Sequence, residues 1–186
     1  MKFTSIVWEI RKTIWFRNYL SSFKVERKGG EMSCFICERI DMIKNGTNPY
    51  FVAELNTGYV VIGDHQRYKG YTCFLCKKHV TELHNMPYEF RLKHLEEMSI
   101  VAEAVFNAFK ADKMNHAMLG NLDSHVHWHL IPRVHGDEPA NAPIWRLPDE
   151  ELFKDSYRPD TEELKEMVIK LREEIDRLTS INKVQN

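Results

Sequence analysis

The chain has 186 residues, of which 43% are hydrophobic and 28% charged, and its formal net charge at pH 7 is -1. This length suits one domain with a hydrophobic core and an appended segment. The balanced charge gives no reason to expect a nucleic-acid partner, and no apolar run approaches the roughly 18 residues of a membrane-spanning helix. Charged residues also interrupt any secretory signal pattern, so we expect a cytoplasmic protein without a membrane partner.

Residues 1–31 differ from the rest of the chain. The first 30 residues carry seven Lys or Arg and two Glu, and the segment ends in KGGE before Met32. Two interpretations stay open for this basic N-terminal extension. Either Met32 is the true start and the extension is misassigned, or residues 1–31 form a basic amphipathic helix on a membrane surface.

The next part of the chain mixes helix and strand patterns. We expect a short helix from Cys34 to Lys44, ended by Asn45-Gly46. The runs FVAEL (residues 51–55) and GYVVIG (58–63) predict a hairpin, and YTCFLC (71–76) predicts a third strand.

A long amphipathic helix follows over residues 87–110, and then HAMLG (116–120) and HVHWHLIPR (125–133) predict two more strands. Five strands with hairpin links and one long helix are typical of an α+β fold with a mainly antiparallel sheet around a central helix. This pattern covers a domain over residues 32–143.

Residues 144–186 are expected to form a C-terminal loop and an amphipathic helix. Prolines keep regular elements short up to Pro159, and the helix begins near Asp160, with Glu163 as a capping-box partner. Its apolar residues alternate four and three apart: Leu164, Val168, Leu171, Ile175 and Leu178. Such a seam fits either packing on the domain or a coiled coil between subunits.

The stretch SHVHWHLIPR places His125, His127 and His129 at alternate positions, a set we call the histidine row. In a strand these three side chains share one face, while the intervening apolar side chains face the core. Adjacent imidazoles disfavour protonation of one another, so we expect mostly neutral rings. A neutral imidazole can serve as a nucleophile, a general base or a metal ligand.

These residues carry a family resemblance. HVHWHLI matches the pattern His-x-His-x-His followed by two apolar residues, and the chain also has CFIC, CKKH, LGN before the row and PR after it. From about Met32 to Pro143 the chain resembles the histidine triad (HIT) family. The residues of its HWH and PR motifs are similar to those of the diadenosine tetraphosphate hydrolase-like branch. The resemblance implies a HIT-like fold, a homodimer and a nucleotide hydrolase or transferase that acts at an α-phosphate through a nucleotidyl-histidine intermediate.

The resemblance also implies roles for single residues. His127 would be the nucleophile, and His129 would contact the α-phosphate and the leaving group. Asn121 and Ser124 occupy positions of phosphate-contacting polar groups, and Asp64 lies near the position of a ribose-binding acid or amide. The implied substrates are dinucleoside polyphosphates, such as diadenosine tetraphosphate, or nucleoside phosphoramidates.

Two C-x-x-C pairs suggest a zinc site in a reducing compartment. Cys34 and Cys37 need two further ligands for tetrahedral closure, and an all-cysteine site with Cys73 and Cys76 is one completion. The resemblance implies another, in which His79 and His125 complete the set, and this is the site we expect. No metal at all also stays open.

Two further functional hypotheses compete with the enzyme. The first is a nucleotide-binding, zinc-stabilised interaction module with little or no turnover. The second is redox chemistry at C-x-x-C, which requires reactive free thiols.

Overall fold

The computed structural model describes residues 34–185, so the predicted basic extension over residues 1–31 lies outside the described residues. Within the described range the strands form one antiparallel sheet in the order β1-β2-β3-β5-β4. The strands are β1 (Phe51–Glu54), β2 (Gly58–Ile62), β3 (Thr72–Cys76), β4 (Lys113–Ala117) and β5 (His127–Arg133). The helices are α2 (Phe35–Lys44), α3 (Tyr88–Phe109), α4 (Asp149–Leu152) and α5 (Thr161–Gln185). The predicted α+β fold, with a five-stranded antiparallel sheet, a long helix and a C-terminal helix, is confirmed.

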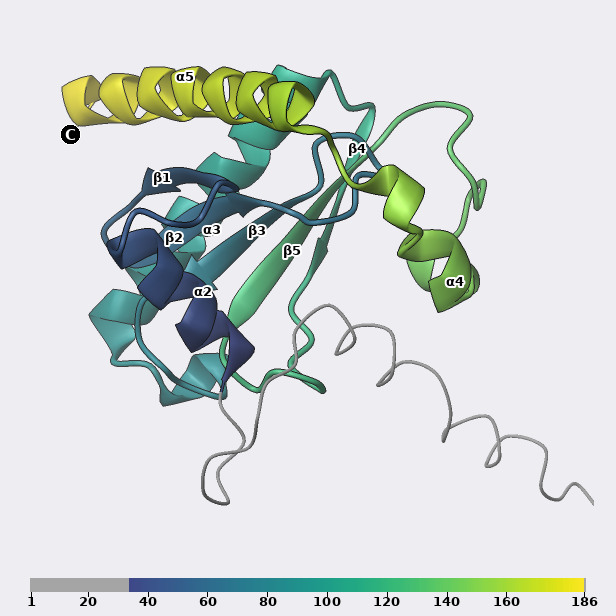
Figure 1. The fold of residues 1–186 in the computed structure, drawn as a ribbon. Helices are drawn as coiled ribbons and strands as arrows, with labels where there is room; N and C mark the ends of the chain where they lie inside the picture. Colours follow the sequence, from purple (N-terminus) through teal and green to yellow (C-terminus); the bar gives the residue numbers. More distant parts are fainter. Residues whose placement is uncertain (1–33, 186) are drawn as a thin grey trace, which may run out of the picture. The chain divides into compact units, whose positions relative to one another are not determined.

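The two faces of the sheet carry different helices (Figure 1). Val60, Phe74 and Leu130 point into the main core, which they share with α3 and α5. Tyr59, Val61 and Leu75 point the other way and pack against Ile36 and Ile40 of α2. Because side chains alternate along a strand, residues of β2, β3 and β5 divide between a core face and an α2 face.

The C-terminal helix packs on the domain. The five apolar residues of its seam are all buried in the main core, and Arg172 donates a hydrogen bond to the carbonyl of Val52 in β1 at 2.7 Å. Asp160 caps the helix by accepting from the backbone N–H groups of Glu162 and Glu163. The seam therefore faces its own chain.

Two predicted strand boundaries are wrong. The fourth strand lies at Lys113–Ala117 instead of residues 116–120, because the backbone leaves α3 through Lys110 in the left-handed region (φ 54°) and begins to pair with β5 almost at once. Strand β5 starts at His127 instead of His125. The sequence of apolar and polar residues does not reveal this register, since Asn115, His116 and Ala117 give no clear alternation.

The segment expected to be a loop up to Pro159 contains α4 and two 3-10 turns, Ile144–Arg146 and Asp155–Tyr157. Ile144 and Leu152 are buried against Tyr68 and Ile131. This packing holds the segment beside the loop that joins β2 to β3. No helix among the described residues is long and apolar enough to cross a membrane.

Candidate functional site

The antiparallel pairing of β5 with β3 positions the last two members of the histidine row. His127 lies opposite Leu75 and His129 lies opposite Cys73. Leu75 packs against α2, so both imidazoles stand on the α2 face of the sheet. Trp128 and Leu130 pack into the core on the other face. The predicted division of the strand into a core face and an imidazole face therefore appears in the structure.

A chain of buried hydrogen bonds holds β5 on the core face of the sheet, opposite the imidazole face. The indole N–H of Trp128 donates to Nε2 of His94 at 3.3 Å, and Nδ1 of His94 lies 3.0 Å from the Thr57 hydroxyl. That hydroxyl donates to the Glu97 carboxylate at 2.6 Å. The ring of His94 also stacks on Phe74, with 4.8 Å between the centroids. Burial lowers the pKa of His94 to about 4, so its ring is neutral at pH 7.

One ring nitrogen of His127 is engaged in a hydrogen bond to the backbone. Its Nδ1 lies 2.7 Å from the backbone carbonyl of His125, and because a carbonyl oxygen can only accept, Nδ1 carries the proton. Nε2 of the neutral ring then holds a lone pair. Burial raises the pKa of the nearby Asp123 carboxyl, and the charge of His127 partly offsets that increase. This arrangement suits a nucleophile at Nε2.

His129 lies beside His127, with 4.8 Å between the ring centroids. Burial, together with a smaller contribution from the adjacent His127, lowers the pKa of His129 to about 4. The Tyr71 hydroxyl lies 2.6 Å from Nδ1 of His129, and the Cys73 thiol lies 3.3 Å from that hydroxyl. Burial raises the pKa of Cys73 to about 11, so the thiol keeps its proton at pH 7. The expectation of neutral rings holds for His129.

The four predicted metal ligands form a compact group. The ligand atoms of Cys34, Cys37, His79 and His125 all lie within 4.8 Å of one another. Nδ1 of His125 lies 3.5 Å from the Cys34 sulfur and 3.4 Å from the Cys37 sulfur, and Nδ1 of His79 lies 3.3 Å from the Cys37 sulfur. A tetrahedral zinc ion with ordinary bond lengths separates its sulfur and nitrogen ligands by about 3.6 Å. The four residues therefore fit a tetrahedral metal ion.

The surroundings prepare these residues for a metal. Nε2 of His125 donates to the carbonyl of Cys76 at 2.7 Å, which directs the lone pair of Nδ1 toward the two sulfurs. Cys34 is the N-cap of α2, and its sulfur accepts from the backbone N–H of Cys37 at 3.4 Å. Burial and the neighbouring Cys34 together raise the pKa of Cys37 to about 11, so this thiol has to release its proton when a metal binds.

The all-cysteine alternative does not fit the structure. In the described part of the chain Cys73 contacts Tyr71 and His129, while Cys76 is fully buried with Met86 and Val126. Neither belongs to the group of four ligands. The two cysteines diverge because residues three apart in a strand point to opposite faces.

The predicted substrate-binding residues lie in two places. Asp64 follows β2, where its carboxylate forms an ion pair with Arg39 of α2 and lies 3.9 Å from Arg158. Asn121 and Ser124 are exposed in the loop between β4 and β5. Both Asp64 and Arg39 act on the pKa of Cys73, which places their charges near the Tyr71 and His129 pair.

Sequence reasoning missed Tyr71, Cys73 and Arg39 as neighbours of the site. Tyr71 and Cys73 are two residues apart and so share the strand face of His129, but this signal becomes visible only once β3 is known to pair with β5. Arg39 lies on a helix that the sequence predicts, and nothing in its local pattern indicates the pairing with Asp64.

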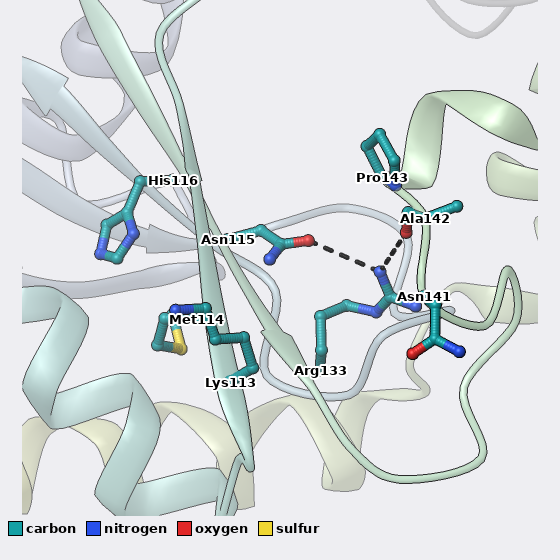
Figure 2. Close-up of a pocket in the computed structure, with 8 residues that line it drawn as sticks. All are labelled: Lys113, Met114, Asn115, His116, Arg133, Asn141, Ala142 and Pro143. Atoms are coloured by element: carbon teal, nitrogen blue, oxygen red, sulfur yellow. Dashed lines mark hydrogen bonds between the residues drawn. The ribbon is translucent and has the colours of Figure 1, made fainter.

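A pocket of about 610 Å³ lies elsewhere, between the outer edge of β4 and the loop after β5 (Figure 2). Its lining residues are Lys113, Met114, Asn115, His116, Arg133, Asn141, Ala142 and Pro143. The Arg133 guanidinium donates to Asn115, to the carbonyl of Ala142 and to the carbonyl of Pro139, so it serves to hold the loop. The described lining contains no member of the histidine row, and we do not assign the reaction to this pocket.

Comparisons with known proteins agree with this geometry. The family model of the HIT domain matches residues 49–136, which include all three histidines of the row. A comparison with curated proteins gives no match.

Several solved structures share the fold. A histidine triad protein from Bradyrhizobium japonicum is 24% identical, with a TM-score of 0.59 over 67% of this chain and 89% of that one. A histidine triad nucleotide-binding protein from Sulfolobus tokodaii is 22% identical, with a TM-score of 0.59 over 76% and 93% of the two chains. A zinc-bound histidine triad family protein from Mycobacterium smegmatis is 23% identical, with a TM-score of 0.57 over 82% and 99%.

The match of residues 49–136 to the HIT domain model and the fold shared with these solved structures make this chain similar to the HIT family. Proteins of this family generally act on nucleotides at the α-phosphate, and some of its members are not catalysts.

The buried His94 predicts a pH-dependent stability. Below pH 6.5 the unfolded chain binds a proton that folded His94 does not bind until the pH reaches about 4. The free energy of unfolding should therefore fall as the pH falls through this window, by up to about 3 kcal/mol from this residue. Urea denaturation of wild type and His94→Gln between pH 7 and pH 4.5 measures the contribution, and the variant should show the shallower pH dependence. Equal slopes for the two proteins would contradict it.

Proposed function

We propose that the protein hydrolyses nucleotides at an α-phosphate and that His127 forms the nucleotidyl-histidine intermediate. The observation that carries this proposal is the hydrogen bond from Nδ1 of His127 to the His125 carbonyl, which leaves a lone pair on Nε2. The ring is also 8% exposed, so little water competes for that nitrogen. A buried, neutral and oriented imidazole is the nucleophile that attack on phosphorus requires.

The reaction follows in two displacements. Nε2 of His127 attacks the α-phosphorus, a P–N bond forms, and the bond to the leaving group breaks with its electron pair on the leaving atom. Water then attacks the same phosphorus and gives up one proton to solvent or to the released leaving group. The P–N bond breaks with its electron pair on Nε2, and His127 returns to its neutral form. The net reaction adds one water across the scissile bond, and hydrogen-bond donors around the phosphate stabilise the charge that spreads over its oxygens.

The substrate classes that we propose are dinucleoside polyphosphates of the diadenosine tetraphosphate kind and nucleoside phosphoramidates. We assign Asn121 and Ser124 to the phosphate, because they lie in the loop that enters β5, and His129 to the phosphate and the leaving group. Asp64 is assigned to the ribose. Both of its arginine contacts are made by Oδ2, and we assign Oδ1 to a ribose hydroxyl.

We also propose that Cys34, Cys37, His79 and His125 hold a structural zinc ion. The fit of their sulfur and nitrogen atoms to a tetrahedron supports it, as does the zinc-bound protein from Mycobacterium smegmatis with the same fold. A bound ion would tie α2 and the segment after β3 to the start of β5. The expected homodimer follows from the family resemblance, whereas the expected cytoplasmic location follows from the interrupted signal pattern in the sequence, and both stay predictions.

Turnover by wild type and His127→Asn tests the proposed reaction. A panel of dinucleoside polyphosphates, phosphoramidates and adenylylated conjugates is assayed for released mononucleotide. We expect the substitution to lower kcat by about 10³-fold or more while nucleotide still binds, because the nucleophile is lost and the pocket remains. His116→Asn, at an exposed histidine of β4, is the matched control and should keep wild-type turnover. Nucleotide binding with no turnover in any of the three proteins would instead favour the binding module.

Metal content tests the zinc proposal. Protein purified without chelators should contain about one zinc per chain, and His79→Ala should lose most of it and melt at a lower temperature, since a structural ion stabilises only the folded state. His84→Ala, at an exposed histidine five residues further on, should retain the metal. Zinc that stays bound equally in both variants, or wild-type protein that binds none when zinc is supplied, would overturn the assignment.

A further inference from the structure

Tyr71 contacts the reactive face without having a role in the proposed chemistry. It immediately precedes β3, and its hydroxyl lies 2.6 Å from Nδ1 of His129. The two rings are nearly parallel, with an interplanar angle of 18° and 6.0 Å between the centroids. The hydroxyl therefore meets His129 at the ring nitrogen that is nearer to the backbone, which leaves Nε2 at the outer end of the ring.

The position of the Tyr71 ring is fixed by its surroundings. A Cβ atom on Gly63 would lie 2.3 Å from the ring, so the phenol packs directly on a backbone that has no side chain there. The backbone carbonyl of Tyr71 accepts from the N–H of Gly63 at 2.8 Å and from the Gln66 side chain at 2.9 Å. These contacts hold the phenol in place before any ligand binds.

The chemistry of the three groups gives the hydrogen bond a direction. A phenol is a far stronger acid than a neutral imidazole N–H, so the hydroxyl is the better donor and Nδ1 of His129 the better acceptor. The Cys73 thiol, 3.3 Å from the phenol oxygen, keeps its proton at pH 7 and can donate to that oxygen. Both hydrogen bonds then point in the same direction: the Cys73 thiol donates to the Tyr71 oxygen, and the Tyr71 hydroxyl donates to Nδ1 of His129.

We propose that Tyr71 is a positioning residue that holds His129 in the tautomer with its proton on Nε2. The inference rests on the proposed function of the histidine row. His127 has its proton on Nδ1 and a lone pair at Nε2, whereas His129 has the opposite arrangement. Two adjacent imidazoles thus present different atoms to the same phosphate. His127 offers an electron pair to phosphorus, and His129 offers an N–H to one of its oxygens.

The first measurement is the tautomer itself. Nitrogen-15 NMR of histidine-labelled wild-type protein at pH 7 should show His129 as one species, with a protonated Nε2 and a hydrogen-bonded, unprotonated Nδ1. Tyr71→Phe keeps the ring and removes the hydroxyl, and it should change the Nδ1 shift of His129 and give a mixture of tautomers. A proton on Nδ1 of His129 in the wild type would overturn the proposal.

The second measurement is turnover of the best substrate from the panel. Tyr71→Phe should lower kcat by about 10- to 100-fold with KM within about threefold, because an oriented donor acts mainly on the charge that develops in the transition state. Tyr68→Phe is the matched control, since Tyr68 is a buried tyrosine of the same loop whose hydroxyl donates to the Glu138 carbonyl. It should keep wild-type kcat and the wild-type His129 spectrum.

The two proposals fail in different ways. If wild type and His127→Asn turn over equally slowly, the proposed function fails, and the NMR result still decides the role of Tyr71 in fixing His129. If wild type is active but Tyr71→Phe matches it in both kcat and the His129 spectrum, only the positioning role fails.

Discussion

Strand β5 pairs with β3 along one edge and with β4 along the other, and this pairing fixes the direction of every side chain it carries. His127 and His129 point to the α2 face, while Trp128 points into the core and joins the buried chain that ends at Glu97. A shift by one residue would turn the imidazoles into the core and the indole out of it. The hydrogen bond of the Trp128 indole and the apolar packing on that face make such a shift costly, so the site depends on this register.

Hydrogen bonds to backbone carbonyls then determine which nitrogen of each chemically identical ring carries the proton. The Cys76 carbonyl takes the Nε2 proton of His125 and directs Nδ1 toward the two sulfurs, whereas the His125 carbonyl takes the Nδ1 proton of His127 and leaves Nε2 bare. The ring of His129 meets a phenol instead of a carbonyl. Three neighbouring histidines can therefore take three different roles: a metal ligand, a nucleophile and a hydrogen-bond donor.

The sequence predicts much of this arrangement, because alternation of apolar and polar residues reports which side chains share a strand face. The helix at Cys34 to Lys44, the hairpin and the four clustered ligand residues are all present in the structure. Contacts between distant segments were not predictable in the same way. Tyr71 meets His129 only because β3 and β5 pair in one register, and Asp64 meets Arg39 because α2 packs on that face. The predicted bounds of the fourth strand are wrong for a related reason. Pairing with β5 sets the position of β4, and the residues of β4 show little alternation of apolar and polar side chains.

The central claim is that Nε2 of His127 becomes bonded to phosphorus. Wild-type protein mixed with a nucleotide substrate, quenched within the first turnovers at alkaline pH and digested, can be searched by mass spectrometry for a nucleotidyl group. We predict an acid-labile adduct on the peptide that contains His127, absent from His127→Asn protein treated in the same way. Efficient turnover with the adduct on another residue, or with no adduct under conditions where the second displacement is rate-limiting, would contradict the account.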